Sequence, residues 1–214
     1  MAQFFSIHPD NPQPRLIQQA VQMIHAGGVI VYPTDSCYAL GCHLGDKDAV
    51  ERMRRIRGID EHHHLTLVCR DLSEIAKFAR VDNVQYRFLR AHTPGSYTFI
   101  LRATREVPRR LAHPKRSTIG LRVPSHRVVQ ALLEQLDEPL LSTTLILAGD
   151  ESPLSSATDI RGRLEHQVEL VIDGGELATQ PTTVIDFSGA EPTLVRIGKG
   201  SVEGLGINRI KKNL

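Results

Sequence analysis

The first predicted element follows from apolar residues that recur every three or four positions across residues 13–26. This period places their side chains on one face of an amphipathic helix. Pro12 precedes the segment and Gly27-Gly28 follows it, as expected for the start and the end of a helix. The short apolar run at residues 29–32 then predicts a buried strand.

The rest of the chain continues to alternate between helix and strand patterns. Asp46 and Asp71 stand at expected N-cap positions, Glu74 stands at a capping-box position, and Gly58 stands at an expected helix end. Further helices are predicted at residues 47–57, 71–79, 83–92, 107–113, 125–136 (capped by Ser125) and 159–166. Strands are predicted at residues 38–42, 65–69, 97–103, 118–123, 140–147, 168–172, 183–187 and 194–197.

Strands and helices do not follow one another in a strict βαβ rhythm. We therefore expect a single α/β domain with a mixed, twisted open sheet flanked by helices. Residues 1–205 are expected to form this domain. The basic tail at residues 206–214 is expected either to be disordered and attract RNA or only to aid solubility.

The composition is that of an ordinary globular protein, with 214 residues, 41% hydrophobic and 23% charged. No apolar run reaches the roughly 18 residues that a membrane span needs. The N-terminal residues lack the basic and apolar regions of a signal peptide. Cys37, Cys42 and Cys69 show no CxxC spacing. We therefore expect reduced thiols, a cytoplasmic location and no membrane partner.

Charge is strongly segregated along the chain. Residues 50–130 hold 17 Lys/Arg against 7 Asp/Glu, whereas residues 131–190 hold 2 against 11. This pattern favours an anionic partner, although folding can also mix the charges in space. Five cations in twelve residues are predicted to form the basic rim of a concave, RNA-binding surface: Arg105, Arg109, Arg110, Lys115 and Arg116.

Arginines occur at two places where they suggest a ligand. Four arginines lie within residues 52–57, at the end of a predicted helix. Cations stabilise a helix C-terminus, but this number exceeds what capping needs, so Arg55 and Arg57 could close on one polyphosphate. Arg122 lies inside an otherwise apolar strand, where it must either pair with a carboxylate or face a ligand.

Hydroxyl groups gather at the ends of two predicted strands. Thr34 and Ser36 follow Pro33 after the first strand, and Ser142–Thr144 begin another. Such positions can present hydroxyls and backbone N–H groups to a polar ligand. The alternatives are a plain strand–turn–strand in the first case and hydroxyls bonded to backbone in the second.

Taken in order, the motifs resemble the YrdC-like superfamily. These are an apolar strand with Pro-Thr-Asp-Ser, then Arg-x-Arg, Pro-Gly-x-x-Thr-Phe, Leu-Arg-Val-Pro, Ser-Thr-Thr, Pro-Thr-Thr-Val-Ile-Asp and Val-Arg-x-Gly. The resemblance extends from about Pro12 to Gly198. The N-terminal FFSIHPDNPQ and the segment Glu106–Leu111 are similar to the YciO branch of that superfamily.

The resemblance implies a YrdC-like fold and a threonylcarbamoyl-AMP synthase. Such enzymes condense L-threonine, bicarbonate and ATP, with Mg²⁺, to threonylcarbamoyl-AMP and pyrophosphate for tRNA modification. It implies catalytic roles for Arg55 and Arg57 and threonine binding by Thr34, Ser36 and Thr182. It implies nucleotide binding by Arg55, Arg57, Thr98, Arg122, Ser142, Thr144 and Arg196.

The sequence departs from the family pattern at two of these positions. Arg55 replaces the lysine of a Lys-x-Arg motif, and Ile146 replaces the asparagine of a Ser-x-Asn motif. A lost polar contact typically costs about 1–3 kcal/mol, so the departures predict a weak or altered activity. The His62–His64 run lacks a completing set of ligands, and no structural metal is expected.

Two other functions compete with synthesis of this adenylate. The basic residues could belong to a non-enzymatic protein that binds double-stranded RNA or tRNA through phosphate contacts. Alternatively, the chain could carry out carbamoyl-adenylate chemistry on a different acceptor.

Overall fold

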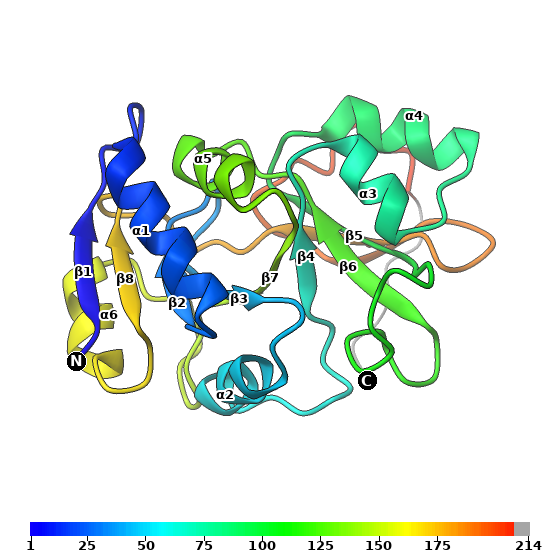
Figure 1. Ribbon diagram of the computed structural model, residues 1–214. Coiled ribbons are helices and arrows are strands. Elements are labelled where there is room, and N and C mark those ends of the chain that lie inside the picture. The colour runs from blue at the N-terminus through cyan, green and yellow to red at the C-terminus, as the bar shows by residue number, and fades with distance from the viewer. Residues whose placement is uncertain (208–214) are drawn as a thin grey trace.

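Ten strands form one mixed sheet in the computed structural model, which describes residues 1–207 (Figure 1). The strands are β1 (Gln3–Ser6), β2 (Ile30–Tyr32), β3 (Ala39–His43), β4 (Thr66–Val68), β5 (Tyr97–Arg102), β6 (Thr118–Arg122), β7 (Leu140–Thr144), β8 (Leu170–Asp173), β9 (Thr183–Asp186) and β10 (Thr193–Arg196). Their order across the sheet is β1-β8-β2-β3-β7-β4-β6-β5-β9-β10. The sheet contains parallel pairs such as β4 with β6 and antiparallel pairs such as β3 with β7, which confirms the predicted α/β domain with a mixed sheet.

Six helices flank the sheet: α1 (Pro14–His25), α2 (Lys47–Arg57), α3 (Leu72–Phe78), α4 (Asn83–His92), α5 (Arg127–Leu136) and α6 (Ala157–Leu164). Two clusters of buried side chains make up the core. One cluster packs α1 and α5 against strands that include β2 and β8. The other joins α2, α3, α4 and α6 to residues of the central strands. No helix within residues 1–207 is long and apolar enough to cross a membrane.

Local sequence signals explain where α2 begins and ends. Asp46 accepts a hydrogen bond from the backbone N–H of Ala49, 2.9 Å away, and so caps the N-terminus. Gly58 adopts a left-handed conformation with φ of 63°, which ends the helix without the penalty of a Cβ atom. The helix therefore places Arg57 in its last turn.

Several predicted elements differ in the structure. Residues 107–113 form turns instead of a helix, and the buried Val107 and Leu111 anchor this loop to the core. β1, which pairs with β8, was not predicted. Residue Glu74 accepts from the N–H of Arg70 rather than from Asp71, so the capping box is incomplete.

The helix predicted from residue 125 begins at Arg127. Ser125 does not cap it, because both its N–H and its hydroxyl lie at the carboxylate of Asp35, at 3.1 and 3.3 Å. β7 ends at Thr144, three residues before the predicted end, where the N–H of Ile146 turns back onto the Thr144 carbonyl. The proposed boundary at 205 is not tested, and residues 208–214 of the predicted tail lie outside the described residues.

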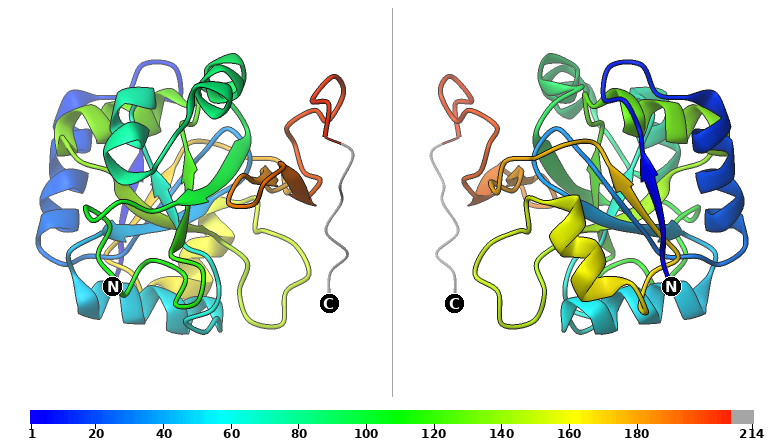
Figure 2. Two further views of the ribbon diagram at one scale, coloured as in Figure 1. Left: turned by 90° about the vertical axis from the view of Figure 1, so that its right-hand side faces the viewer. Right: turned by 90° about the vertical axis from the view of Figure 1, so that its left-hand side faces the viewer.

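The loop that follows β7 helps to determine where a ligand could bind. It projects from the side of the sheet that faces away from α1 (Figure 2). Ile146 of this loop lines one cavity together with residues of β9 and β10 and with Arg57 at the end of α2. Residues from several strands and a helix terminus therefore meet at this cavity.

Candidate functional site

A cavity of about 280 Å³ lies where these segments meet. This volume is close to the lower end of the range for small-molecule pockets, roughly 300–1,000 Å³. Both polar and apolar side chains line the cavity. The lining residues used below are Arg57, His62–His64, Thr98, Arg122, Ser142–Thr144, Ile146, Thr182 and Arg196.

Arg57 reaches the cavity from the last turn of α2. Its Nη1 donates to the backbone carbonyl of Ile146, and its Nε lies 3.4 Å from the hydroxyl of Thr143. These contacts join the helix end to the turn after β7. Nη2 of Arg57 has no hydrogen-bond partner within residues 1–207, so it can donate to a ligand.

Arg122 enters from β6 and is 93% buried, with 7% of its surface exposed. One of its terminal nitrogens is paired with the carboxylate of Asp35, and the other lies 3.5 Å from the hydroxyl of Ser36. Its Nε is buried without a partner in the described chain. The first alternative from the sequence is therefore confirmed, because Arg122 pairs with an acid; its contact with a ligand stays a prediction, although it lines the cavity.

Arg196 belongs to β10 and is held by a single residue of the neighbouring segment. Its Nε donates to the carbonyl of Thr182 at 3.0 Å, and its Nη2 donates to the hydroxyl of Thr182 at 3.2 Å. That hydroxyl lies 2.8 Å from the hydroxyl of Thr98. Nη1 of Arg196 has no hydrogen-bond partner in the described part of the chain, so this arginine also retains a free donor.

The hydroxyls of β7 play different parts. Ser142 donates to the carbonyl of Leu40 at 2.9 Å and shares a 2.6 Å hydrogen bond with Tyr32. Burial raises the pKa of Tyr32 to about 12, so this phenol stays protonated at neutral pH. Thr144 lines the cavity at the end of the strand. Thr144 is thus better placed than Ser142 to offer a hydroxyl to a ligand.

The cavity is electropositive because three arginines line it and, among the described residues, only Arg122 is paired with a carboxylate, that of Asp35 behind the wall. Burial lowers the pKa of Arg57, and repulsion from Arg196 lowers it further. The pKa of Arg196 is lowered first by burial, and repulsion from Arg122 adds to this. A bound anion would relieve this repulsion, so the electrostatics favour a phosphate or carboxylate ligand.

Three residues predicted for the site lie outside the lining. Arg55 is exposed in a separate shallow pocket with Glu51 and Asp60, so it does not close on a ligand together with Arg57. The two positions are about 200° apart around the helix, which directs them to different surfaces.

Thr34 and Ser36 also lie outside the cavity wall. The hydroxyl of Thr34 donates to the Cys37 carbonyl at 2.6 Å, and Ser36 is 99% buried beside it. They stabilise the loop that carries Asp35 and Cys37. Burial raises the pKa of the Cys37 thiol, so this residue contributes a neutral group to the cavity wall and no activated nucleophile.

The histidine run is the part of the site that the sequence did not assign. His62, His63 and His64 all line the cavity between α2 and β4. His64 stacks on His113 with ring centroids 4.8 Å apart and lies 3.0 Å from the Thr118 hydroxyl. The one feature of the sequence that could have indicated a place in the site is that the run lies only a few residues after Arg57.

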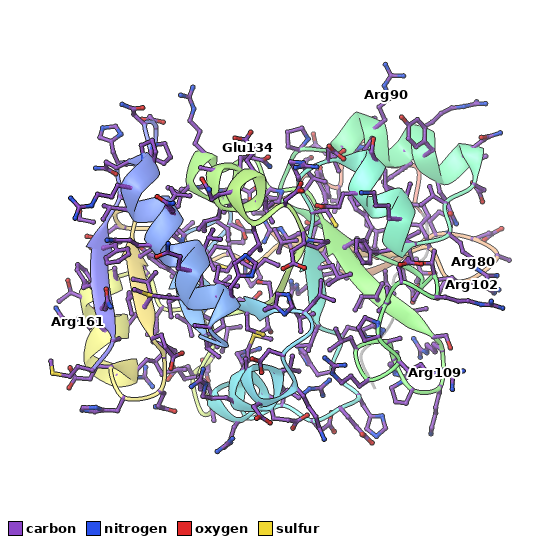
Figure 3. All side chains as sticks on the ribbon, in the orientation of Figure 1. Arg80, Arg90, Arg102, Arg109, Glu134 and Arg161 are labelled. Carbon is purple, nitrogen blue, oxygen red and sulfur yellow. The ribbon has the colours of Figure 1, made fainter. Side chains whose placement is uncertain are left out.

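The residues predicted to form an RNA-binding rim do not line this cavity. Arg110 donates to the carbonyls of Leu44 and Gly45, and Arg116 lies 3.8 Å from Asp186. Arg116 shares a separate pocket with Arg80 and Arg102. Figure 3 shows Arg80 and Arg102 near one end of the molecule. Arg105, Arg109 and Lys115 are exposed. The basic rim and its concave surface remain predictions.

The lining offers little to a magnesium ion. Mg²⁺ is usually bound by one or two carboxylates together with substrate phosphates. No Asp or Glu from residues 1–207 lines the cavity. The protein side therefore does not fit a resident Mg²⁺, and positive charge is supplied by arginines instead.

Comparison with known proteins decides the family. A family model for Sua5, YciO and YrdC proteins, described as "Telomere recombination", matches residues 22–198. The chain belongs to the Sua5/YciO/YrdC family. It is 58% identical to YciO of Escherichia coli K12, with 95% of this chain and 98% of that protein covered. It is 34% identical to a threonylcarbamoyl-AMP synthase of Chromobacterium violaceum, with 84% and 92% covered.

Solved structures of the family have the same fold. The crystal structure of E. coli YciO matches with a TM-score of 0.92 at 58% identity, covering 95% of this chain and 98% of that one. Sua5 of P. abyssi, solved with L-threonine, matches with a TM-score of 0.90 at 24% identity. That match covers 98% of this chain and 63% of Sua5, and it supports the fold alone.

Proposed function

We propose that this family member forms an acyl adenylate from ATP in the arginine-lined cavity, with L-threonine and bicarbonate as the other substrates. The amine of L-threonine would first form a bond to the carbon of bicarbonate with loss of water, which gives N-carboxy-threonine. A carboxylate oxygen of this carbamate would attack the α-phosphorus of ATP. The bond from that phosphorus to the bridging oxygen would break, and pyrophosphate would leave with the bonding electrons. The product, threonylcarbamoyl-AMP, would supply a tRNA modification.

The observation that carries this proposal is the convergence of Arg57, Arg122 and Arg196 on one cavity without an acidic lining residue. Negative charge builds up on the α-phosphate of the transferred adenylyl group and on the leaving pyrophosphate in such a reaction. Guanidinium groups with free donors stabilise that charge and hold the two reactants together. The attacking group is a substrate oxygen, so no protein nucleophile is required.

Each arginine is already oriented before a ligand binds. Arg57 is fixed by a carbonyl and a hydroxyl, Arg122 by Asp35, and Arg196 by Thr182. Preoriented donors lose little entropy when they bind a ligand. The protein-derived charge also explains how the site could act although its lining offers no carboxylate to a metal.

The hydroxyl pair of Thr98 and Thr182 is the best candidate for the amino-acid end. Both groups line the cavity and lie next to Arg196, which suits a hydroxylated amino acid with a carboxylate. The L-threonine bound to P. abyssi Sua5 and the activity named for the C. violaceum relative support threonine as the amino acid.

The Ile146 side chain is half-buried in the cavity wall where the family pattern has asparagine. It offers the nucleotide no hydrogen bond, although its backbone carbonyl holds Arg57. A nucleotide group left unpaired there predicts weaker ATP binding than in a synthase with asparagine.

The decisive experiment incubates the purified full chain with ATP, labelled bicarbonate and each amino acid in turn. We expect a labelled carbamoyl-adenylate with L-threonine, together with release of pyrophosphate. The Arg196→Met variant should lose this product, whereas the Arg90→Met variant, at an exposed arginine outside the cavity, should retain it. ATP binding with product only from another amino acid would identify a different acceptor, and absence of ATP binding would refute the proposal.

A further inference from the structure

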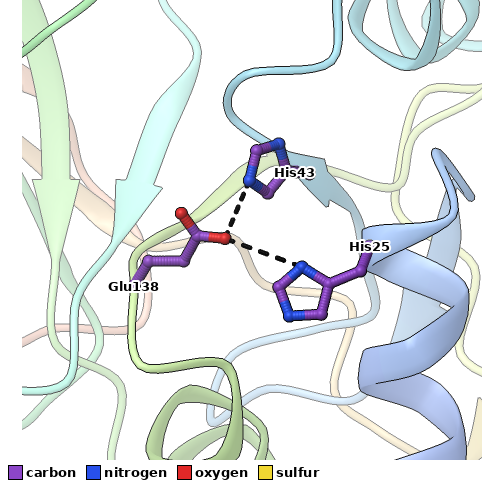
Figure 4. Close-up of side chains that lie close together, drawn as sticks. All are labelled: His25, His43 and Glu138. Atoms are coloured by element: carbon purple, nitrogen blue, oxygen red, sulfur yellow. Dashed lines mark ion pairs between the residues drawn. The ribbon is translucent and has the colours of Figure 1, made fainter.

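A second group of chemistry-bearing side chains lies away from the cavity. Nε2 of His43 is 2.8 Å from Oε1 of Glu138, and Nδ1 of His25 is 4.0 Å from the same oxygen. All three candidate ligand atoms lie within 4.8 Å of one another. Figure 4 shows both imidazoles directed toward the carboxylate. None of the three residues lines the arginine-rich cavity.

The fold holds these residues together from three separate elements. His25 is the last residue of α1, and His43 is the last residue of β3. The antiparallel register places Leu140 opposite His43, which brings Glu138 close to that histidine. Pro139 lies between Glu138 and the start of β7, where its fixed φ stiffens the connection.

We propose that His25, His43 and Glu138 form a surface site for a divalent transition-metal ion, with zinc as the best fit. Two imidazole nitrogens and one carboxylate oxygen are a common zinc ligand set, and water would complete the coordination. Nitrogen-rich sites favour such ions over Mg²⁺ or Ca²⁺. The site is independent of the proposed synthase reaction.

The geometry is close to what a tetrahedral ion requires. Zinc–nitrogen bonds of about 2.0–2.1 Å place neighbouring ligand atoms roughly 3.3 Å apart. The observed separations of 2.8 and 4.0 Å lie on either side of this value. The side chains are 30–52% exposed, so they can rotate to adjust.

The surroundings also favour a cation. His25 closes α1, and Glu138 follows the C-terminus of α5 by two residues. The unpaired carbonyls at a helix C-terminus carry partial negative charge, which attracts cations. The partial negative charges of two helix ends and the charge of one carboxylate therefore favour a bound cation at this position.

Binding requires one rearrangement, which gives the proposal a specific signature. Nδ1 of His43 accepts a 3.0 Å hydrogen bond from the N–H of Gly45, so the proton of the neutral ring is on Nε2, facing Glu138. Metal binding at Nε2 would move this proton to Nδ1. The Gly45 N–H would then lose its partner and bond to water, because this loop is accessible.

The test uses the full chain after removal of metals with a chelator. Zn²⁺ is titrated by calorimetry, and Co²⁺ is titrated by visible absorbance to report the ligand geometry. We expect one bound ion per chain, a zinc-dependent rise in Tm and a shift of the Gly45 amide resonance. His25→Gln, His43→Gln and Glu138→Gln should each weaken binding by about tenfold or more, because even indirect support of a metal typically contributes 10- to 100-fold.

Control variants at other histidines test whether zinc binds at this site and not elsewhere on the chain. His166→Gln removes an exposed histidine 3.2 Å from Glu165, and His63→Gln alters the cavity run. Both variants should bind zinc within twofold of the parent chain. Unchanged affinity in His25→Gln and Glu138→Gln, loss of binding in His63→Gln, or no saturable binding at all would overturn the proposal.

Discussion

Removing the charge of Arg57 should weaken ATP binding far more than removing the charge of Arg55. Both arginines lie in the last turn of α2, but only Arg57 lines the cavity. Methionine retains most of the aliphatic stem and deletes the guanidinium group. Arg57→Met and Arg55→Met are therefore a matched pair on one helix.

The expected size of the effect follows from the contacts. A hydrogen bond to a charged group contributes about 1.5–3 kcal/mol, which corresponds to roughly a 10- to 150-fold increase in the Kd for ATP. Arg57 also holds the Ile146 carbonyl and contacts the Thr143 hydroxyl. Loss of these contacts should cost about 1 kcal/mol of unfolding free energy, or about 2–4 °C in Tm for a chain of this size.

Calorimetric titration with ATP and thermal unfolding measure the two effects separately. Arg55→Met should change neither quantity appreciably, because Arg55 is exposed and outside the cavity. If the two variants weaken ATP binding equally, the ligand reaches both arginines and the assignment of the cavity is wrong. A lowered Tm with an unchanged Kd would make Arg57 purely structural.

Three further predictions follow from neighbouring residues. Ile146→Asn should tighten ATP binding by up to about tenfold, because the side chain lines the cavity and asparagine could hydrogen-bond the nucleotide. The Tm should not fall, because this side chain is only half-buried. No gain in affinity would show that the pocket suits another group. Asp35→Asn should cost about 3–5 kcal/mol of unfolding free energy in urea denaturation, because it leaves buried Arg122 without its counter-charge, and Ser125→Ala should cost much less. Burial, and then repulsion from a neighbouring histidine, lowers the pKa of His64 to about 4. Between about pH 6.5 and 4 the unfolded chain therefore binds more protons than the folded chain, so the free energy of unfolding should fall as the pH drops. Denaturation at several pH values should show a flatter dependence of this free energy on pH in His64→Gln, and the same slope in both proteins would contradict the prediction.

Local patterns in the chain were sufficient to predict most elements of the fold. The period of apolar residues predicted α1, and the Asp46 cap with Gly58 predicted both ends of α2. These signals act between residues a few positions apart, so they are readable without tertiary contacts. The motif order likewise indicated the family, and Thr98, Arg122 and Thr182 from these motifs line the cavity, while their binding roles stay predictions.

Local patterns were misleading where a distant residue competes for the same group. Ser125 was predicted to cap a helix, but Asp35, 90 residues away, takes its N–H and hydroxyl. Val107 and Leu111 have helical spacing, yet they anchor a loop. Long-range contacts override weak local preferences because burial and ionic hydrogen bonds stabilise more than propensity does.

The division of roles within the site was decided by the tertiary structure. The sequence identified Arg55 and Arg57 as a pair, but the rotation of α2 directs only Arg57 into the cavity. The His62–His64 run is part of the wall because the tertiary structure places the loop after α2 at the same cavity as residues of β6 and β9. Composition and spacing determined which chemical groups are available. Their direction depends on how each helix and strand packs against the sheet, and that is set by contacts between residues far apart in the chain.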